Sequence, residues 1–252
     1  MTGLIRRTGP AAGPAPAGPA ALSVRDLSVD YDGVVALAPL SFELAAGETL
    51  AVLGANGAGK TTLANALSGL VAMRGGVIDL DGTPVAAMTP EARARLGIGH
   101  LPDFRAVFPN LTVTENLQVF FQSASRRAAR SLAESALGRF PALRQRTRIP
   151  AGRLSGGEQQ MLAFCRLLVR APRVLIVDEL SHGLAPGIVA ELFKALNALK
   201  GSCTTIVIEQ YVGNALAIAD SVIVLSRGQV RHRGPAAGLS VDSVAEIYSL
   251  DA

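Results

Sequence analysis

The stretch that most constrains this chain is Gly54-Ala55-Asn56-Gly57-Ala58-Gly59-Lys60-Thr61, which fits the pattern G-x-x-x-x-G-K-[ST]. It follows an apolar run at residues 49–53 and precedes a helical pattern at residues 62–70. In such a strand, loop and helix, backbone N–H groups and the Lys60 ammonium bind phosphates, and the Thr61 hydroxyl can ligate Mg²⁺. The pattern predicts that ATP or GTP binds here with Mg²⁺. The candidate phosphate-binding residues are Gly54, Asn56, Gly57, Ala58, Gly59, Lys60, Thr61 and Thr62.

Short apolar runs rich in β-branched residues alternate with helical segments, which predicts an α/β fold. Four runs are almost continuously apolar, as in parallel strands that are buried on both faces. They lie at residues 49–53, 174–177, 205–208 and 222–225. The runs at 22–31 and 40–44 alternate more, which favours an antiparallel edge β-sheet. Strand signals are lacking from about 104 to 153, where helical patterns at 112–121 and 126–140 predict a small inserted α-helical subdomain.

Residues 1–20 are rich in Gly, Pro and Ala, so we expect a disordered tail followed by one domain over residues 21–252. The tail lacks the apolar core of a signal peptide, and no stretch of the chain reaches the roughly 18 apolar residues that span a bilayer. Cys165 and Cys203 lack disulfide or metal spacing, which favours buried thiols in a reducing compartment.

The positive charge is concentrated in one part of the sequence. Between residues 126 and 153, eight arginines face the single acid Glu134. Such a run is usually a solvated helix face, and the alternative is a basic surface beside an anionic membrane or a membrane partner. The net charge is only +4, 4% of residues are aromatic and Trp is absent, so a nucleic-acid partner is not predicted.

Two adjacent acids, Asp178 and Glu179, end the apolar run Val174-Leu175-Ile176-Val177. Ligands bind at the carboxyl ends of strands in open α/β sheets, so these acids are candidates for Mg²⁺ binding and for orienting a water molecule. The alternative is that they only cap the strand.

The run Leu154-Ser155-Gly156-Gly157-Glu158-Gln159-Gln160 has the S-x-x-E spacing of a capping box, ahead of an apolar run at residues 161–169. A helix should begin here. With Gly156 and Gly157 in its first turn, backbone N–H groups and the helix dipole are open to an anion such as phosphate. This run closely resembles the signature sequence of ATP-binding cassette (ABC) proteins. Together with the phosphate loop and the paired acids, it makes the chain resemble this family from about Leu22 to the C-terminus.

The resemblance implies a P-loop NTPase cassette that hydrolyses ATP with Mg²⁺. Asp178 would be the Walker B aspartate, Glu179 the general base and Tyr31 the aromatic that stacks on adenine. Ser155, Gly156 and Gly157 would contact the nucleotide held by a second cassette. The chain departs from the family where Leu180 replaces a proline, and where Ser181-His182-Gly183-Leu184 lacks an acid common in the family's D-loop. His182 is a candidate to communicate with the second cassette across the dimer interface, although a lone histidine is more often structural.

Two further departures narrow the resemblance. Asp103 stands at the lid position where the family usually has a glutamine that touches Mg²⁺, and Gln210 stands at the position of the switch histidine. An acidic lid residue and Glu-Gln at the switch, with Leu-Thr-Val-x-Glu-Asn-Leu from residue 111, resemble the ATP-binding subunits of bacterial branched-chain amino acid importers. A related subunit for urea or amide uptake is the alternative, as is a cassette that senses nucleotide with little hydrolysis.

This subgroup implies a set of partners and a location. We expect a second cassette, identical or paralogous, two transmembrane permease subunits and, indirectly, an extracytoplasmic solute-binding protein. The chain would then bind peripherally to the cytoplasmic face of the membrane. A mechanical or DNA-repair cassette is disfavoured because Thr61 and Ser155 are too close in sequence for a long coiled coil between them. A translation-factor cassette is disfavoured because only one phosphate loop is present.

Overall fold

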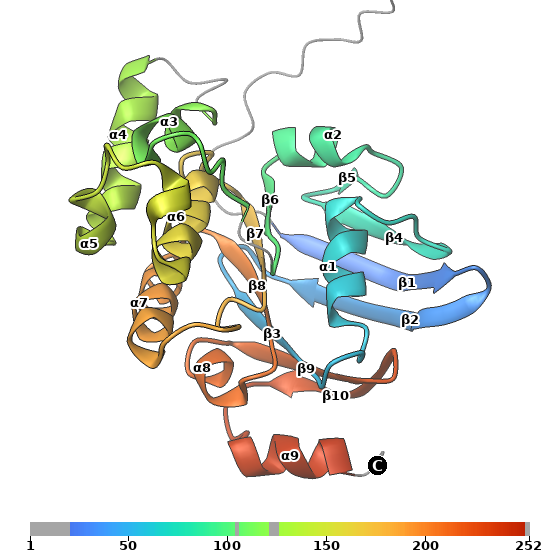
Figure 1. The fold of residues 1–252 in the computed structure, drawn as a ribbon. Coiled ribbons are helices and arrows are strands. Elements are labelled where there is room, and N and C mark those ends of the chain that lie inside the picture. The colour runs from blue at the N-terminus through green and yellow to red at the C-terminus, as the bar shows by residue number, and fades with distance from the viewer. Residues whose placement is uncertain (1–20, 104–105, 121–125, 250–252) are drawn as a thin grey trace, which may run out of the picture.

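The computed structural model describes residues 21–103, 106–120 and 126–249, and its centre is a six-stranded sheet of order β10-β9-β3-β8-β7-β6 (Figure 1). Its strands are β3 Thr49–Leu53, β6 Ile98–Leu101, β7 Val174–Asp178, β8 Thr204–Glu209, β9 Ser221–Ser226 and β10 Gln229–Pro235. β6, β7, β8, β3 and β9 run parallel, and β10 pairs antiparallel with β9. The four runs predicted as buried strands are β3, β7, β8 and β9, so the predicted parallel core is confirmed.

A second, antiparallel sheet has the order β2-β1-β4-β5. Its strands are β1 Leu22–Tyr31, β2 Val34–Leu44, β4 Gly75–Leu80 and β5 Thr83–Pro84. A tight turn joins β1 to β2 through Asp32 and Gly33, whose φ angles are +51° and +84°. Asp-Gly is favoured in such turns because both central residues must adopt positive φ. This sheet is the antiparallel edge sheet that the alternating runs predict.

Alternation along the central strands sends side chains into two hydrophobic cores. In β3, Ala51 and Leu53 belong to a core shared with the helices that follow β6, whereas Leu50 and Val52 belong to a core shared with the antiparallel sheet. Helix α1 Lys60–Ser68 lies between the two sheets and contributes Leu63 to the second core. Because both faces of β3 are buried, every residue of this strand after Thr49 is apolar.

Most remaining helices cover the face of the central sheet that is remote from β1 and β2 (Figure 1). They are α3 Val113–Gln118, α4 Arg126–Gly138, α5 Pro141–Arg144, the 3-10 turn Ala151–Arg153, α6 Gly156–Leu168, α7 Pro186–Asn197, α8 Val212–Leu216 and α9 Val241–Ser249. The short helix α2 Pro90–Arg95 lies instead beside α1 and β6, on the side of the antiparallel sheet. α3, α4 and α5 gather around α6, where the rings of Phe140 and Phe164 meet edge to face with centroids 6.0 Å apart. The helical patterns predicted at 112–121 and 126–140 correspond to α3 and α4. The subdomain limits stay a prediction, and the predicted tail lies outside the described residues.

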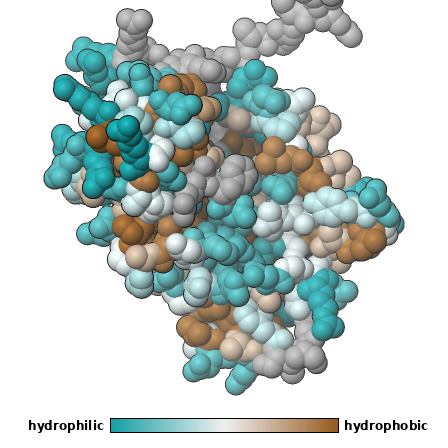
Figure 2. Space-filling model, viewed as in Figure 1, coloured by the Kyte–Doolittle hydropathy of each residue, from teal (hydrophilic) through white to brown (hydrophobic). Residues whose placement is uncertain are grey.

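The arginine-rich segment lies on the surface around α4 and α5, which is largely hydrophilic in Figure 2. Among the arginines of this segment whose side-chain burial the structure describes, the exposed ones are Arg127, Arg130, Arg144, Arg146, Arg148 and Arg153. Within the described residues, no helix combines the length and the apolar character needed to cross a bilayer.

Candidate nucleotide-binding site

The predicted phosphate loop connects the end of β3 to the start of α1. Its first glycine is enclosed: a Cβ on Gly54 would lie 2.6 Å from the backbone oxygen of Leu225 and 2.9 Å from the Cβ of Ala58. Gly59 caps α1 with a φ of +98°, a region that side-chain-bearing residues rarely adopt. The path of the loop therefore depends on glycine at these two positions.

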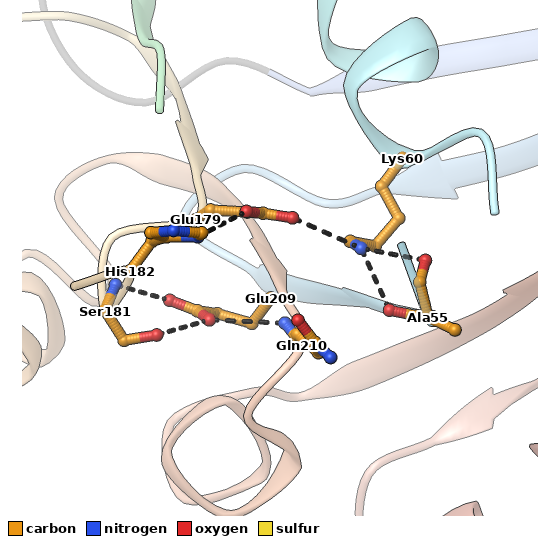
Figure 3. A network of polar contacts seen from close by, with 8 residues as sticks. Ala55, Lys60, Glu179, Ser181, His182, Glu209 and Gln210 are labelled. Carbon is orange, nitrogen blue, oxygen red and sulfur yellow. Dashed lines mark hydrogen bonds and ion pairs between the residues drawn. The ribbon is translucent and has the colours of Figure 1, made fainter. Parts of the chain in front are cut away.

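Lys60 is the first residue of α1 and is almost completely buried, with 3% exposure. Its Nζ donates hydrogen bonds to the backbone oxygens of Gly54 at 2.9 Å and Ala55 at 3.1 Å. It also lies 3.4 Å from Oε1 of Glu179 (Figure 3). The loop's own carbonyls thus aim the ammonium into the loop, where it can neutralise phosphate charge.

A cavity of about 570 Å³ opens beside the loop. It brings together seven predicted site residues, namely Asn56, Gly57, Gly59, Lys60, Thr61, Thr62 and Glu179. Four lining residues, Val35, Ala36, Arg227 and Gly228, were not predicted. They come from β2 and from the turn between β9 and β10, which Gly228 ties to the loop by donating to the Ala58 oxygen at 3.0 Å. In the sequence, the only local sign of this turn is Arg227-Gly228 shortly after the apolar run at residues 222–225.

Asp178, at the end of β7, has a side chain that is 1% exposed. Burial raises the pKa of Asp178 to about 6; the Thr61 hydroxyl opposes this, and the charges of Glu179 and Asp103 add to it. Within the described chain, neither carboxyl oxygen has a hydrogen bond of standard geometry. A buried carboxylate with unsatisfied oxygens beside a hydroxyl fits a hard cation such as Mg²⁺.

Thr61, Asp178 and Asp103 are therefore the residues that would hold such an ion. Asp103 is exposed and follows β6, the strand that pairs with β7. Its negative charge raises the pKa of Asp178, so the two carboxylates are close enough to interact electrostatically. The role of each as a metal ligand stays a prediction.

Glu179 follows Asp178 with a left-handed φ of +48°. That conformation costs a residue other than glycine about 1–2 kcal/mol and persists where neighbours enforce it. Its backbone N–H donates to the Ile208 oxygen at 2.9 Å, and its own carbonyl accepts from the N–H of His182 at 3.1 Å. The side chain has Lys60 at one oxygen and, at 3.2 Å, Nδ1 of His182 at the other. Leu180, where the family usually has proline, is buried in the core.

The predicted capping box at the start of α6 is confirmed. The Ser155 Oγ accepts from the Glu158 N–H at 3.3 Å, and Oε2 of Glu158 accepts from the Ser155 N–H at 2.8 Å. Arg146 lies 3.0 Å from the other oxygen of Glu158. Ser155 is exposed and Gly156 half-buried, and neither lines the cavity beside the phosphate loop, nor does Gly157.

Six other predicted residues lie outside that cavity lining. They are Tyr31, Gly54, Ala58, Asp103, Asp178 and Gln210. Tyr31 ends β1 opposite Val34 and is 47% exposed, next to the Val35 that does line the cavity. Gln210 is exposed at the end of β8, with its backbone N–H 3.3 Å from Oε2 of Glu209. Their contacts with nucleotide stay predictions.

The sequence pattern of the family described as "ABC transporter" matches residues 37–182, which include the phosphate loop, the signature run and the paired acids. The chain belongs to the ABC transporter family. It is therefore an ATP-binding cassette of the P-loop NTPase fold, an ATPase of the kind coupled to transport. The α/β fold and family expected from the motifs are confirmed.

Relatives of this ABC transporter ATPase carry different transport names. A probable branched-chain amino acid transport ATP-binding protein of Archaeoglobus fulgidus is 35% identical over 212 residues, which cover 83% of this chain and 90% of that protein. A high-affinity branched-chain amino acid transport ATP-binding protein of Pseudomonas aeruginosa is 36% identical over 229 residues, 90% of this chain and 98% of that one. A Nod factor export ATP-binding protein of Burkholderia orbicola is 34% identical over 239 residues, 92% and 78%.

The fold is also that of a solved ATP-binding subunit of an ABC transporter. That structure superposes with a TM-score of 0.80 over 90% of this chain and 99% of that one, at 24% identity. At 24% identity, this similarity establishes the fold of the ABC transporter ATPase and gives no information on the transported solute.

Proposed function

We propose that this ATPase is the nucleotide-binding subunit of an importer and powers the uptake of branched-chain amino acids. The observation that carries the proposal is the 35% and 36% identity, over most of the chain, to two proteins named for branched-chain amino acid transport. The acidic lid residue Asp103 and the Glu209-Gln210 pair support the same subgroup. A cassette for urea, an amide or another small polar solute is the second candidate, because relatives named for other cargo are almost as similar.

ATP would bind in the 570 Å³ cavity with its phosphates at the loop. Lys60 supplies positive charge from inside the loop, and backbone N–H groups of Asn56 to Thr62 complete the cradle. Tyr31 is the proposed surface for adenine, because its strand partner Val34 directly precedes the cavity-lining Val35. When bound through Thr61, Asp178 and Asp103, Mg²⁺ would neutralise charge on the β and γ phosphates.

Glu179 is the proposed general base. Its carboxylate lies between Lys60 and His182, and Glu179 lines the cavity that would hold the γ phosphate. There it can orient a water molecule in line with the bond to be broken and take its proton. Gln210 is proposed to hydrogen-bond the γ phosphate; an amide can donate this bond but brings no positive charge.

A second cassette is proposed to complete the site. Ser155 is exposed at the N-terminus of a 13-residue helix but lies outside the cavity of its own chain, as a residue that contacts a partner's nucleotide would. Two permease subunits would place the pair at the cytoplasmic face of the membrane, with an extracytoplasmic solute-binding protein delivering the solute. ATP would close the pair, and hydrolysis would reopen it.

A first experiment tests the catalytic part of the proposal in the assembled transporter. Glu179→Gln should lower steady-state phosphate release by at least about 100-fold, because general-base catalysis contributes roughly that much. It should also accumulate an ATP-bound dimer, measurable by light scattering. The control is Glu191→Gln, which changes an exposed acid on α7 in the same way. Full turnover by Glu179→Gln would refute the role of Glu179, and negligible turnover by the wild type would favour a nucleotide sensor.

A second experiment tests the solute. Uptake of radiolabelled leucine should fall when the gene is deleted, and should be restored by the wild-type chain and not by Glu179→Gln. Unaltered leucine uptake together with lost urea or amide uptake would move the assignment to the second candidate.

A further inference from the structure

The carboxylate of Glu209 lies at the centre of a buried hydrogen-bond network that the proposed chemistry does not yet use. Glu209 ends β8 and is 1% exposed. Its Oε1 accepts from the backbone N–H of Ser181 at 3.0 Å, and its Oε2 accepts from the Ser181 hydroxyl at 2.7 Å and, more weakly, from the N–H of Gln210 at 3.3 Å (Figure 3). Two of these donors belong to the turn after β7, and the third belongs to the end of β8.

The network extends the sheet pairing into the site. Asp178 is paired with Ile208, and the next N–H along β7, that of Glu179, still donates to the Ile208 oxygen. Beyond this bond the ladder ends, and Glu209 continues the connection with its side chain to Ser181. The turn that carries Glu179 in its left-handed conformation is therefore fixed to β8 on both sides of that residue.

An ionised carboxylate suits this position for a chemical reason. Burial raises the pKa of Glu209, and the hydrogen bonds from Ser181 act against that rise. A carboxylate can accept on both oxygens, as the three donors here require, whereas a glutamine has one acceptor oxygen and an NH₂ group. Replacing Glu209 by glutamine would therefore exchange one of the two accepting carboxyl oxygens for an NH₂ donor, with little change in side-chain volume.

Because of this geometry, we propose that Glu209 is a positioning residue that holds Glu179 and Gln210 in fixed relation to each other, by binding the turn at Ser181 and the start of the Gln210 segment with one carboxylate. The inference rests on the proposed roles of Glu179 and Gln210. It predicts that Glu209 affects the hydrolysis step and leaves ATP binding almost unchanged, because Glu209 does not line the nucleotide cavity.

The test uses the assembled transporter with Glu209→Gln, Ser181→Ala and the double variant. Glu209→Gln should lower kcat by about tenfold or more, since small misplacements of a catalytic group have effects of that order. Its Kd for ATP should stay within about twofold of the wild type. Ser181→Ala, which removes the 2.7 Å bond from the other side, should lower kcat by a smaller factor. The double variant should be no slower than Glu209→Gln, because both changes break the same link.

The control is Glu246→Gln, an exposed acid on α9, which should match the wild type in kcat and Kd. A kcat within twofold of the wild type in both Glu209→Gln and Ser181→Ala overturns the inference, as does a fall in kcat that only accompanies lost ATP binding. If Glu209→Gln does not fold, Ser181→Ala decides alone by the same criterion. A full rate in Glu179→Gln would instead refute the proposed function, so the two failures are distinguishable.

Discussion

Lowering the pH should destabilise the folded chain through His100, a residue of β6. Its side chain is partly buried, and burial lowers the pKa of His100 to about 4, although the Asp103 carboxylate opposes this. Its Nε2 is buried without a hydrogen-bond partner in the described structure, and Arg170 lines the same cavity of about 250 Å³ as His100 does. A proton on His100 would therefore be poorly solvated in the folded state.

The sign and size of this pH effect follow from the different pKa values of His100 in the folded and the unfolded chain. An unfolded histidine has a pKa of about 6.5, so between about pH 6.5 and 4 the unfolded chain binds more protons at His100 than the folded chain does. The stability contributed by neutral His100 is complete above that window and is lost as the pH falls through it. The full loss is about 3 kcal/mol, of which about 2 kcal/mol is lost between pH 7.5 and pH 5.

The assay is urea unfolding of the wild type and His100→Leu at pH 7.5, 6.5, 5.5 and 5.0. The comparison is made at each pH because Asp178 and Glu209, whose pKa values are raised, contribute with the opposite sign. The wild type should lose about 2 kcal/mol more than His100→Leu across this range. Leu70→Ala, which alters the same cavity without a titratable group, should keep the wild-type pH dependence. Parallel curves for wild type and His100→Leu would refute the reasoning.

Three further changes test the site and its support. Gly54→Ala puts a Cβ 2.6 Å from a backbone oxygen of β9 and should weaken ATP binding on the order of tenfold or more in a fluorescent-nucleotide titration, whereas Gly138→Ala meets nothing within 4 Å and should not. Arg166→Ala removes a buried guanidinium from between two phenylalanine rings at 4.8 and 4.4 Å, so thermal melting should show a loss of about 2–4 kcal/mol that exposed Arg130→Ala does not show. Asp178→Asn should raise the Mg²⁺ concentration for half-maximal phosphate release about tenfold or more.

Each of these has a result that would contradict it. Normal nucleotide affinity in Gly54→Ala would mean that the loop can shift without cost, and an unchanged melting temperature in Arg166→Ala would mean that the aromatic rings repack. An unchanged Mg²⁺ requirement in Asp178→Asn would remove that residue from the proposed ligand set.

Local signals in the sequence were sufficient for the elements that carry their own chemistry. β3 after Thr49 and β7 before Asp178 are apolar because both faces are buried, and the Ser155 cap needs only Glu158 three residues later. The cavity walls could not be predicted in this way. Val35 and Gly228 reach the phosphate loop only because strands that are distant in the sequence pair with each other. The hydrophobic pattern around either residue gives no sign of that pairing.

The Glu209 network shows the same limit. In the sequence, Glu209 is only the residue before a candidate switch, at the end of an apolar run. Its importance depends on Ser181, which lies 28 positions earlier, and on the adjacency of β7 and β8. Adjacent strands bring such pairs together, but the order of strands in a parallel sheet cannot be predicted from the sequence of either strand alone.

The turn between β9 and β10 has a consequence for how this protein is made. The phosphate loop is translated well before β8 and β9, the two neighbours of β3, and before the Gly228 turn that contacts Ala58. A nascent chain in which Lys60 has already left the ribosome therefore still lacks Arg227 and Gly228 of the cavity lining. We expect ATP to protect the newly made chain from proteolysis only after β10 has left the ribosome, and stalled chains that end before β8 to gain no protection from nucleotide.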